Sequence, residues 1–237
     1  MSQKDDVVLA MRQNGGYATF KKLNQSVDIS TWKTKTPEAS IRQIVQIYPE
    51  LFFKIKPGLW ALQECRAEVL ERLCIAPNDD RADEMFTHTY YQGIIVEIGN
   101  KKGYKTYVPP QDKNKKFLET KLSELTSTDK FPEFSYESLI RRARTVDVIW
   151  FNERNMPCGF YEVEHTTDIK NSLNKFYELQ DFRAEFKIIA DEKRKEQFMD
   201  IMSASIYNPI RNLVNFMSYE NLIKQYEKEK IVLDDVL

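Results

Sequence analysis

Cysteine, glycine, proline and long apolar runs are all scarce in this chain, and each scarcity excludes something. Three cysteines occur among 237 residues, and none of them forms a CxxC pair, which argues against a structural zinc site. Seven glycines and nine prolines are too few for a loop-rich or disordered chain. No apolar run approaches the roughly 20 residues that cross a bilayer, and the polar start MSQKDD contains no apolar signal segment. We therefore expect a cytoplasmic protein without a membrane partner.

Histidine is equally sparse, with only His88 and His165 in the chain. Two histidines this far apart form neither an HNH-type site nor an HExxH zinc site, and no Ser/His/Asp triad is evident. We expect His88 to be a helix residue without a catalytic task and His165 to be structural, with a place next to the substrate as the alternative for His165. The absence of GxxxxGK[ST] argues against ATP-driven translocation by this chain.

The net charge of −1 suggests no polyanionic partner, but the distribution of charge is uneven. Residues 1–62 contain nine basic side chains against five acidic ones, and residues 101–121 contain seven lysines against Asp112 and Glu119. Local basic surface matters more than total charge for phosphate binding. The alternative is that these lysines are ordinary solvated surface residues.

The first sixty residues predict three helices followed by a hairpin, within a chain that is 42% hydrophobic and long enough for two domains. Apolar periodicity indicates helices over 7–12 and 20–27, and a third begins at Thr36-Pro37-Glu38, which combines a capping hydroxyl, an early proline and a carboxylate. The segment LFFKIKPGLWAL at 51–62 is typical of a β-hairpin. This is the winged-helix order, in which the third helix enters the major groove and the hairpin contacts the DNA backbone.

The stretch TPEASIRQIVQIYPELFFKIKPGLWAL resembles the HARE-HTH module, a winged-helix domain found in some chromatin proteins, in an RNA polymerase subunit and fused to restriction endonucleases. The resemblance covers roughly residues 4–63, and KTPEAS and FFKIKPGLWAL are its most specific parts. It implies DNA contact, with protein contact as the alternative. The residues that we expect to meet DNA in this domain are Ser40, Arg42, Gln43, Gln46, Lys54 and Lys56.

The middle of the chain predicts a connection and a long helix. Residues 63–76 indicate a short connecting helix, which Pro77-Asn78-Asp79-Asp80 breaks. Residues 81–98 indicate a helix that ends at Gly99-Asn100, and residues 103–108 indicate a strand stopped by Pro109-Pro110.

Three acids lie on the next two predicted strands. VDVIWF at 146–151 is an apolar strand that contains Asp147, and GFYEVEH at 159–165 is a second strand that contains Glu162 and Glu164. Because side chains alternate along a strand, the two glutamates share a face, and Asp147 on the neighbouring strand can share it too. Buried acids without partners are costly, and a divalent cation removes that cost. Hard oxygen ligands suit Mg²⁺ or Mn²⁺; the alternative is a set of salt-bridged strand acids.

This spacing resembles the PD-(D/E)XK nuclease motif, in which an Asp is followed after a gap by an acid-x-Lys on the next strand. The resemblance makes Asp147 and Glu162 metal ligands and catalytic residues, and it places Glu164 where the family has its lysine. Glu164 is then either a metal ligand or a general base, and Val146 replaces the motif proline. Related folds also use an acid from the N-terminal helix, and Glu97 is in a suitable position; the alternative is a surface carboxylate.

The rest of the predicted core follows in the order of that superfamily. A helix is expected from Thr167-Asp168 to about 182, a strand over 186–190 and a helix over 191–202. Lys170, Asn171 and Lys175 either contact phosphate or are solvated, and we assign Lys170 and Asn171 to DNA. The expected fold class is an α/β (α+β) restriction-endonuclease-like core with a mixed sheet flanked by helices, preceded by a small winged-helix domain. The expected domains are 1–63 (winged helix), 64–80 (linker) and 81–237 (nuclease).

The resemblance implies a Type II restriction endonuclease that hydrolyses double-stranded DNA to 5′-phosphate and 3′-hydroxyl ends with Mg²⁺, for which Mn²⁺ can substitute. Cutting both strands needs two active sites, so we expect a homodimer, with residues 206–230 as a candidate dimerisation element. A cognate methyltransferase is the expected partner in such a system. Two alternatives stay open: a catalytically inactive DNA-binding regulator that retains a degenerate nuclease fold, and a repair or defence nuclease.

Overall fold

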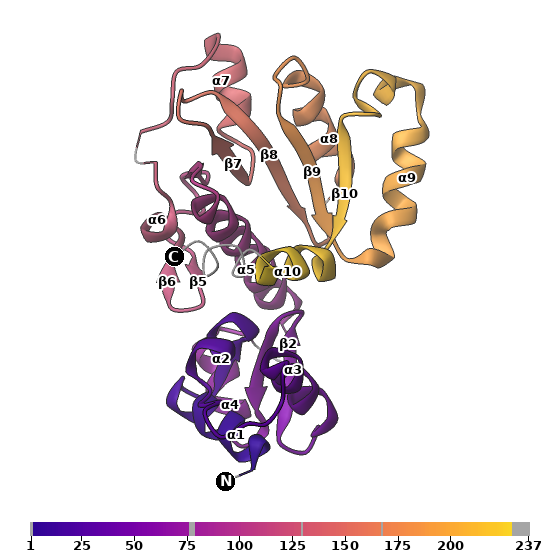
Figure 1. Cartoon of the computed structure of the whole chain (residues 1–237). Helices are drawn as coiled ribbons and strands as arrows, with labels where there is room; N and C mark the ends of the chain where they lie inside the picture. The colour runs from indigo at the N-terminus through magenta and orange to yellow at the C-terminus, as the bar shows by residue number, and fades with distance from the viewer. Residues whose placement is uncertain (1, 76–78, 129, 167, 229–237) are drawn as a thin grey trace. The chain divides into compact units, whose positions relative to one another are not determined.

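The structure, a computed structural model, describes residues 2–75, 79–128, 130–166 and 168–228 (Figure 1). The chain divides into two compact units, Met1–Asp83 and Glu84–Leu237. None of the described helices has the length and apolar character that crossing a membrane requires. Three sequence predictions fall partly outside the described residues: the break at Pro77 and Asn78, the helix start at Thr167, and the last two residues of the 206–230 segment.

The first unit combines helices with a three-stranded antiparallel sheet in the order β1-β3-β2. Its elements are α1 (Gln3–Gln13), β1 (Tyr17–Thr19), α2 (Phe20–Ser26), α3 (Pro37–Ile47), β2 (Phe52–Lys56), β3 (Leu59–Leu62), the 3₁₀ turn η1 (Gln63–Cys65) and α4 (Arg66–Arg72). The three predicted helices, the hairpin and the short connecting helix are all present. Strand β1 was not predicted, because three residues are too few to show an alternating pattern.

The apolar faces of these helices meet in one core. Its fully or nearly fully buried members include Val7 and Met11 of α1, Leu23 of α2, and Ile41 and Val45 of α3. Because each helix buries only one stripe, the opposite faces of the same helices remain polar and exposed.

The second unit is built on a five-stranded mixed sheet in the order β10-β9-β8-β7-β4. Its strands are β4 (Lys105–Tyr107), β7 (Val148–Phe151), β8 (Pro157–Glu164), β9 (Glu185–Ala190) and β10 (Val214–Ser218). Strands β8, β9 and β10 run parallel to one another, whereas β7 is antiparallel to β8 and β4 is antiparallel to β7. The carboxyl end of β8 and the amino end of β7 therefore lie at the same end of the sheet.

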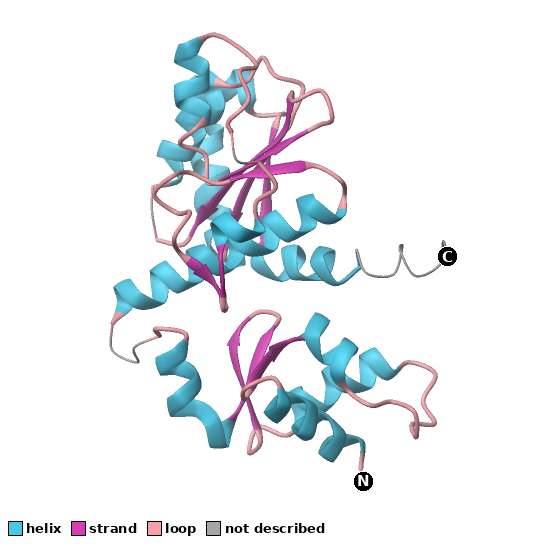
Figure 2. Cartoon of the chain, turned by 90° about the vertical axis from the view of Figure 1, so that its left-hand side faces the viewer, coloured by secondary structure: helices cyan, strands magenta, loops and turns pink. Residues whose placement is uncertain are grey.

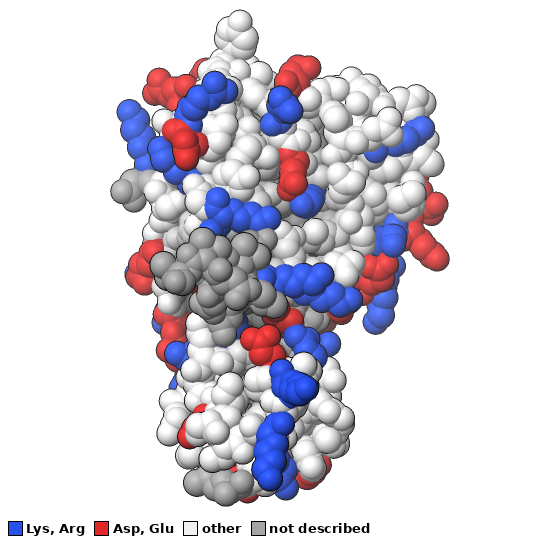
Figure 3. All heavy atoms as spheres, in the orientation of Figure 1, with Lys and Arg blue, Asp and Glu red and all other residues white. Residues whose placement is uncertain are grey.

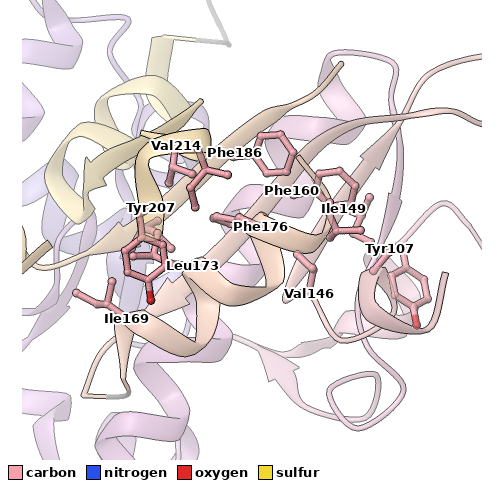
Figure 4. Packing of buried hydrophobic residues seen from close by; sticks show 14 of the residues in the cluster. Tyr107, Val146, Ile149, Phe160, Ile169, Leu173, Phe176, Phe186, Tyr207 and Val214 are labelled. Atoms are coloured by element: carbon pink, nitrogen blue, oxygen red, sulfur yellow. The ribbon is translucent and has the colours of Figure 1, made fainter. Parts of the chain in front are cut away.

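Helices cover both faces of this sheet (Figure 2), which confirms the predicted mixed α/β architecture. On one face lie α7 (Glu137–Ala143), α8 (Ile169–Glu178) and α9 (Lys195–Ser203), whose apolar residues share a cluster with Ile149, Phe160 and Phe186 of the strands. Figure 4 shows Phe176 of α8 pointing into this cluster. The other face carries α5 (Asp80–Lys101). The backbone carbonyl of Ile95 in this helix accepts a hydrogen bond of 3.2 Å from the indole Nε1–H of Trp150 in the sheet.

The remaining elements of the second unit are short or terminal. They are β5 (Lys116–Phe117), β6 (Thr120–Lys121), α6 (Leu122–Leu125), the 3₁₀ turns η2 (Glu192–Arg194) and η3 (Ser205–Ile210), and α10 (Tyr219–Lys228). The sequence did not predict β5, β6, α6, α7 or β10. Helix α10 lies within residues 206–230, the segment that the sequence analysis names as a candidate dimerisation element.

The predicted helix end at Gly99-Asn100 is wrong, because α5 continues to Lys101. Gly99 serves a different purpose there. A Cβ at this position would lie 2.5 Å from the indole nitrogen of Trp150 and 2.7 Å from a side-chain carbon of Thr106. The glycine therefore allows the helix to approach the sheet closely and does not stop the helix.

Candidate active site

Asp147 lies one residue before β7, at the amino end of that strand. The β7–β8 register, continued by one residue, brings it opposite Glu162. Its Oδ2 accepts a hydrogen bond of 2.8 Å from the backbone N–H of Val163 and lies 3.1 Å from Nε2 of His88 in α5. The side chain is 14% exposed, so it reaches the surface while its orientation is held from two sides.

Glu162 and Glu164 both face α8, as strand alternation predicts. The hydroxyl of Ser172 donates to Oε2 of Glu162 over 2.8 Å and also contacts the carboxylate of Glu164. The two glutamates are almost fully buried, at 2% and 4% exposure. One hydroxyl group therefore bridges the two acids that the sequence placed on one face.

Lys175 supplies a positive charge that the sequence analysis had left undecided. Its Nζ lies 2.9 Å from both carboxylate oxygens of Glu162 and donates to the carbonyl of Thr145 at 2.9 Å. The lysine side chain is only 12% exposed. Ser172 and Lys175 are three residues apart on α8 and so lie on one helix face; that spacing, directly after an acid-bearing strand, is the signal that could have found the lysine.

The surroundings of the two acids that lie opposite each other shift their pKa values in opposite directions. Burial, followed by the negative charge of Asp147, raises the pKa of Glu162 to about 8, and Lys175 and Ser172 only partly offset this. Burial also acts to raise the pKa of Asp147, but the hydrogen bond and charge of His88 outweigh it and leave that pKa below its usual value. Burial acts to lower the pKa of His88, yet contact with Asp147 outweighs it and raises that pKa. Asp147 is thus the acid that stays ionised.

Within the described residues, no three His, Cys, Asp or Glu side chains gather closely enough to form a ready metal site. The contacts explain this, because Asp147 is turned toward Val163 and His88 while Glu162 is occupied by Lys175. The donor set nevertheless fits a hard divalent cation, since carboxylate oxygens are its preferred ligands. Burial and the charge of Asp147 raise the pKa of Glu162 because they disfavour its negative charge, and such a cation would stabilise that charge.

Glu97 lies further along α5 than the residue that reaches Asp147. Its carboxylate accepts a hydrogen bond from the hydroxyl of Tyr226 in α10. The side chain of α5 that meets Asp147 is His88. Helix α5 therefore does contribute a polar side chain to the carboxylate site. That side chain is His88, to which the sequence analysis gave no catalytic task.

Gln92 is a second α5 residue that the sequence analysis missed. It is fully buried, and its Nε2 donates to the backbone carbonyl of Asp147 at 3.0 Å and to Oδ2 of Asp112 at 2.9 Å. His88 and Gln92 are four residues apart, the spacing that aligns two polar side chains on one helix face. The sequence signal that could have found Gln92 is therefore its position four residues after His88 in a predicted helix.

The residues assigned to DNA are mostly at the surface. Lys170 and Asn171 are exposed in the first turn of α8, which Asp168 caps through the backbone N–H of Lys170. Of those in the first unit, Gln43, Gln46 and Lys54 are exposed.

The other three predicted DNA contacts of the first unit already have partners within the protein. The guanidinium of Arg42 lies 4.4 Å from the ring centre of Phe20. The hydroxyl of Ser40 hydrogen-bonds to the backbone carbonyl of Thr36 at 3.3 Å. Lys56 forms an ion pair of 2.7 Å with Asp83.

Residues 72–235 match the family model described as the Type II restriction enzyme NmeDI C-terminal domain. The chain belongs to this family. A curated relative, the Type II restriction enzyme NmeDI of Neisseria meningitidis serogroup C, is 24% identical over 124 residues. That alignment covers 48% of this chain and 35% of the relative, so the match spans about a third of that protein's length. No solved structure matches the chain.

The NmeDI C-terminal match includes every residue of the carboxylate site. Asp147, Glu162 and Glu164 lie inside the matched residues, as do Lys175 and His88, whereas residues 1–71 lie outside them. The contacts described above therefore belong to the part of the chain that the family model covers.

Proposed function

We propose that this protein is a restriction endonuclease that hydrolyses double-stranded DNA with a divalent cation, through a variant PD-(D/E)XK site. The observation that carries the proposal is the pair of Asp147 and the buried Glu162, set opposite each other at one end of the sheet with Lys175 against the second acid. Membership of the NmeDI C-terminal family supports it.

In this proposal Asp147 and Glu162 hold Mg²⁺, with Mn²⁺ able to substitute. When bound, the cation would stabilise the negative charge that builds on the phosphate. It would also lower the pKa of a water molecule, whose deprotonated form is the nucleophile that attacks phosphorus. The backbone N–H of Val163 and the imidazole of His88 hold Asp147 in position. Glu162 gives up any bound proton before it acts as a ligand, and Lys175 compensates its charge in the meantime.

Glu164 is either a further ligand or the general base, and Ser172 holds its carboxylate beside that of Glu162. Glu97 would complete the set only after release from Tyr226. Lys175 also provides, from α8, the positive charge that position 164 of β8 does not. The expected products are 5′-phosphate and 3′-hydroxyl ends.

The first unit is proposed to act as the DNA reader, a winged helix of the HARE-HTH kind. Its order of helices and hairpin and the exposed Gln43, Gln46 and Lys54 support this. We also propose a homodimer, to cut both strands, in which residues 206–230 contribute to the interface, and a cognate methyltransferase that protects host DNA. A cytoplasmic location is the corresponding proposal.

One observation favours the second candidate, an inactive DNA-binding regulator: the acids do not form a ready metal cluster among the described residues. The two functions make opposite predictions for cleavage. The purified chain is incubated with plasmid and phage DNA, modified and unmodified, in Mg²⁺. Discrete fragments, whose sequenced ends give the site, are the expected result.

Two variants test the site itself. Glu162→Gln and Asp147→Asn preserve shape and remove one ligand charge each, so cleavage should fall by more than about a hundredfold. Glu153→Gln, in the exposed turn at the far end of β7, is the matched control and should cut like wild type. Intact DNA in every reaction, with wild type equal to Glu162→Gln, would refute nuclease activity and leave the regulator.

A further inference from the structure

A short lysine-rich segment, residues 112–121, lies beside the candidate active site and has no part in the roles above. It contains β5 and β6, and we call it the basic hairpin. Its lysines are Lys113, Lys115, Lys116 and Lys121, against two acids, Asp112 and Glu119. The sequence analysis noted this concentration of lysines and left it open between phosphate binding and ordinary solvation.

The basic hairpin is packed firmly onto α5 through one aromatic side chain. Phe117 is 4% exposed, and its ring lies 5.8 Å, centre to centre, from that of Tyr90. It also fills the space above Gly93, where an added Cβ would come within 2.2 Å of the ring. The hairpin therefore has a defined position on the helix.

The base of the hairpin is joined directly to the strand that carries the first acid. The buried amide of Gln92 donates to Asp112 in the hairpin and to the backbone carbonyl of Asp147. Asp112 in turn pairs with Lys115 at 2.6 Å. Because one side chain bonds to both segments, the base of the basic hairpin lies next to Asp147.

Two lysines of the hairpin face each other directly. Lys116 and Lys121 are cross-strand partners, so their side chains leave the same face, and both are exposed. Like charges opposite one another in an antiparallel pair destabilise it. Within the described part of the chain, Lys113, Lys116 and Lys121 form no ion pair.

Elsewhere in the second unit some cations have acidic partners, as Lys187 has in Glu185 and Arg142 has in Glu178. Figure 3 shows cations and acids interspersed on one face of the molecule. A cross-strand pair of exposed lysines is the kind of surface to which a polyanion binds.

We infer that the basic hairpin binds the DNA backbone next to the scissile phosphate, with Lys116 and Lys121 on neighbouring phosphates. The inference rests on the proposed function for the identity of the polyanion. Lys115 remains with Asp112 and keeps the hairpin attached, while the cross-strand pair contacts DNA. Phosphate contacts position a nucleic acid without reading its sequence, so the hairpin fixes the scissile bond relative to Asp147 and leaves base recognition to other residues.

Salt dependence of binding tests this directly. Affinity for a short duplex is measured by fluorescence anisotropy over a series of KCl concentrations, in EDTA, so that no cleavage occurs. Each lost phosphate contact should reduce the slope of log K against log salt by about 0.9, so K116Q/K121Q should reduce it by about 1.8. The matched control is K105Q/R154Q, which removes two charges at the opposite end of β7 and should leave the slope unchanged.

A third variant separates binding from folding. K121E replaces the like-charge pair by an ion pair with Lys116, so the unfolding temperature should rise while DNA affinity falls. If the lysines were merely structural, stability and affinity would change together. A salt slope for K116Q/K121Q equal to that of the control would overturn the inference.

The position next to the scissile phosphate has its own test. Once the cut site is known, one phosphate beside it is replaced by a neutral methylphosphonate. Wild type should bind this duplex more weakly than the unmodified one, whereas K116Q/K121Q should bind both equally. An equal loss of affinity for the two proteins would refute this placement. Failure of the proposed function looks different, because wild type would then leave DNA intact in Mg²⁺ whatever the salt slopes are.

Discussion

The two acids that face each other across β7 and β8 are stabilised in opposite ways. Asp147 receives a backbone N–H and an imidazole, which favour its charged form, whereas Glu162 is buried and depends on Lys175. This arrangement keeps one acid ionised and gives the other a pKa of about 8. Lys175 is consequently the residue on which the stability of the site without cation depends.

Removing that lysine should therefore be costly. At a pH above the Glu162 pKa of about 8, Lys175→Gln leaves the ionised carboxylate buried without its cation and should lower the free energy of unfolding by about 3 kcal/mol. The double variant E162Q/K175Q removes both charges and should recover much of that loss. Urea unfolding of the two single variants and the double variant in EDTA measures this cycle, and purely additive effects would show that the ion pair contributes nothing.

Cys158 offers a pH-dependent prediction away from the acids. Burial, followed by the negative charge of Glu185, raises the pKa of its thiol to about 11. The thiolate is the reactive form, so below the ordinary pKa of 9.0 this thiol should react about a hundredfold more slowly than an unperturbed one. Its reactivity should continue to rise until the pH reaches about 11, whereas that of an unperturbed thiol levels off near its ordinary pKa of 9.0.

Alkylation by iodoacetamide, followed peptide by peptide in a mass spectrometer, checks this order. The exposed Cys74 in the same sample is the internal reference, and Cys158→Ser identifies the peptide. Equal rates for the two cysteines at pH 8 would contradict the burial of the thiol.

At the scale of elements, α5 organises the candidate site from the back of the sheet. Successive turns of this helix bring His88 to Asp147, Gln92 to both Asp112 and Asp147, and Gly93 under the basic hairpin. The helix is therefore much less tolerant of change at these positions than its length suggests. Glycine in a helix interior normally costs about 1 kcal/mol relative to alanine, and here that cost permits close packing.

Gly93→Ala should consequently destabilise the protein where helix propensity alone would stabilise it. The new methyl group would overlap the ring of Phe117, and overpacking of this kind costs about 1–3 kcal/mol. Thermal unfolding measures the effect. In a Phe117→Ala background the overlap is absent, so the same substitution should there be neutral or stabilising; a loss of the same size in both backgrounds would contradict the packing argument.

At the scale of the whole molecule, the chain consists of two compact units with separate apolar cores. Every residue of the first core lies between Val7 and Cys65. A unit whose core is closed within its own segment has what it needs to fold independently.

A fragment of residues 1–75 should therefore fold alone. Its circular dichroism should show helix, and it should unfold cooperatively. Leu23→Ala, at a fully buried position, should lower the stability of this fragment by about 2–5 kcal/mol. A spectrum of unfolded chain for the wild-type fragment would show that the first unit depends on the second.

Much of this organisation is readable without coordinates. Long periodic runs predicted α1, α3, α5 and α8, and continuous apolar runs predicted β7, β8 and β9, because each buries a stripe or face whose pattern repeats several times. Strands of two or three residues, such as β1 and β5, are too short to show a period. The common face of Glu162 and Glu164 also followed from alternation alone.

What only the tertiary structure decided is which side chains from other elements meet those acids. His88 reaches Asp147 across 59 positions of sequence, and Lys175 reaches Glu162 across 13. Such contacts depend on how helices pack on the two faces of a sheet, and no periodicity along the chain encodes that packing. Local patterns therefore determined the strands and the acids on them, whereas packing determined the lysine, the histidine and the basic hairpin beside them.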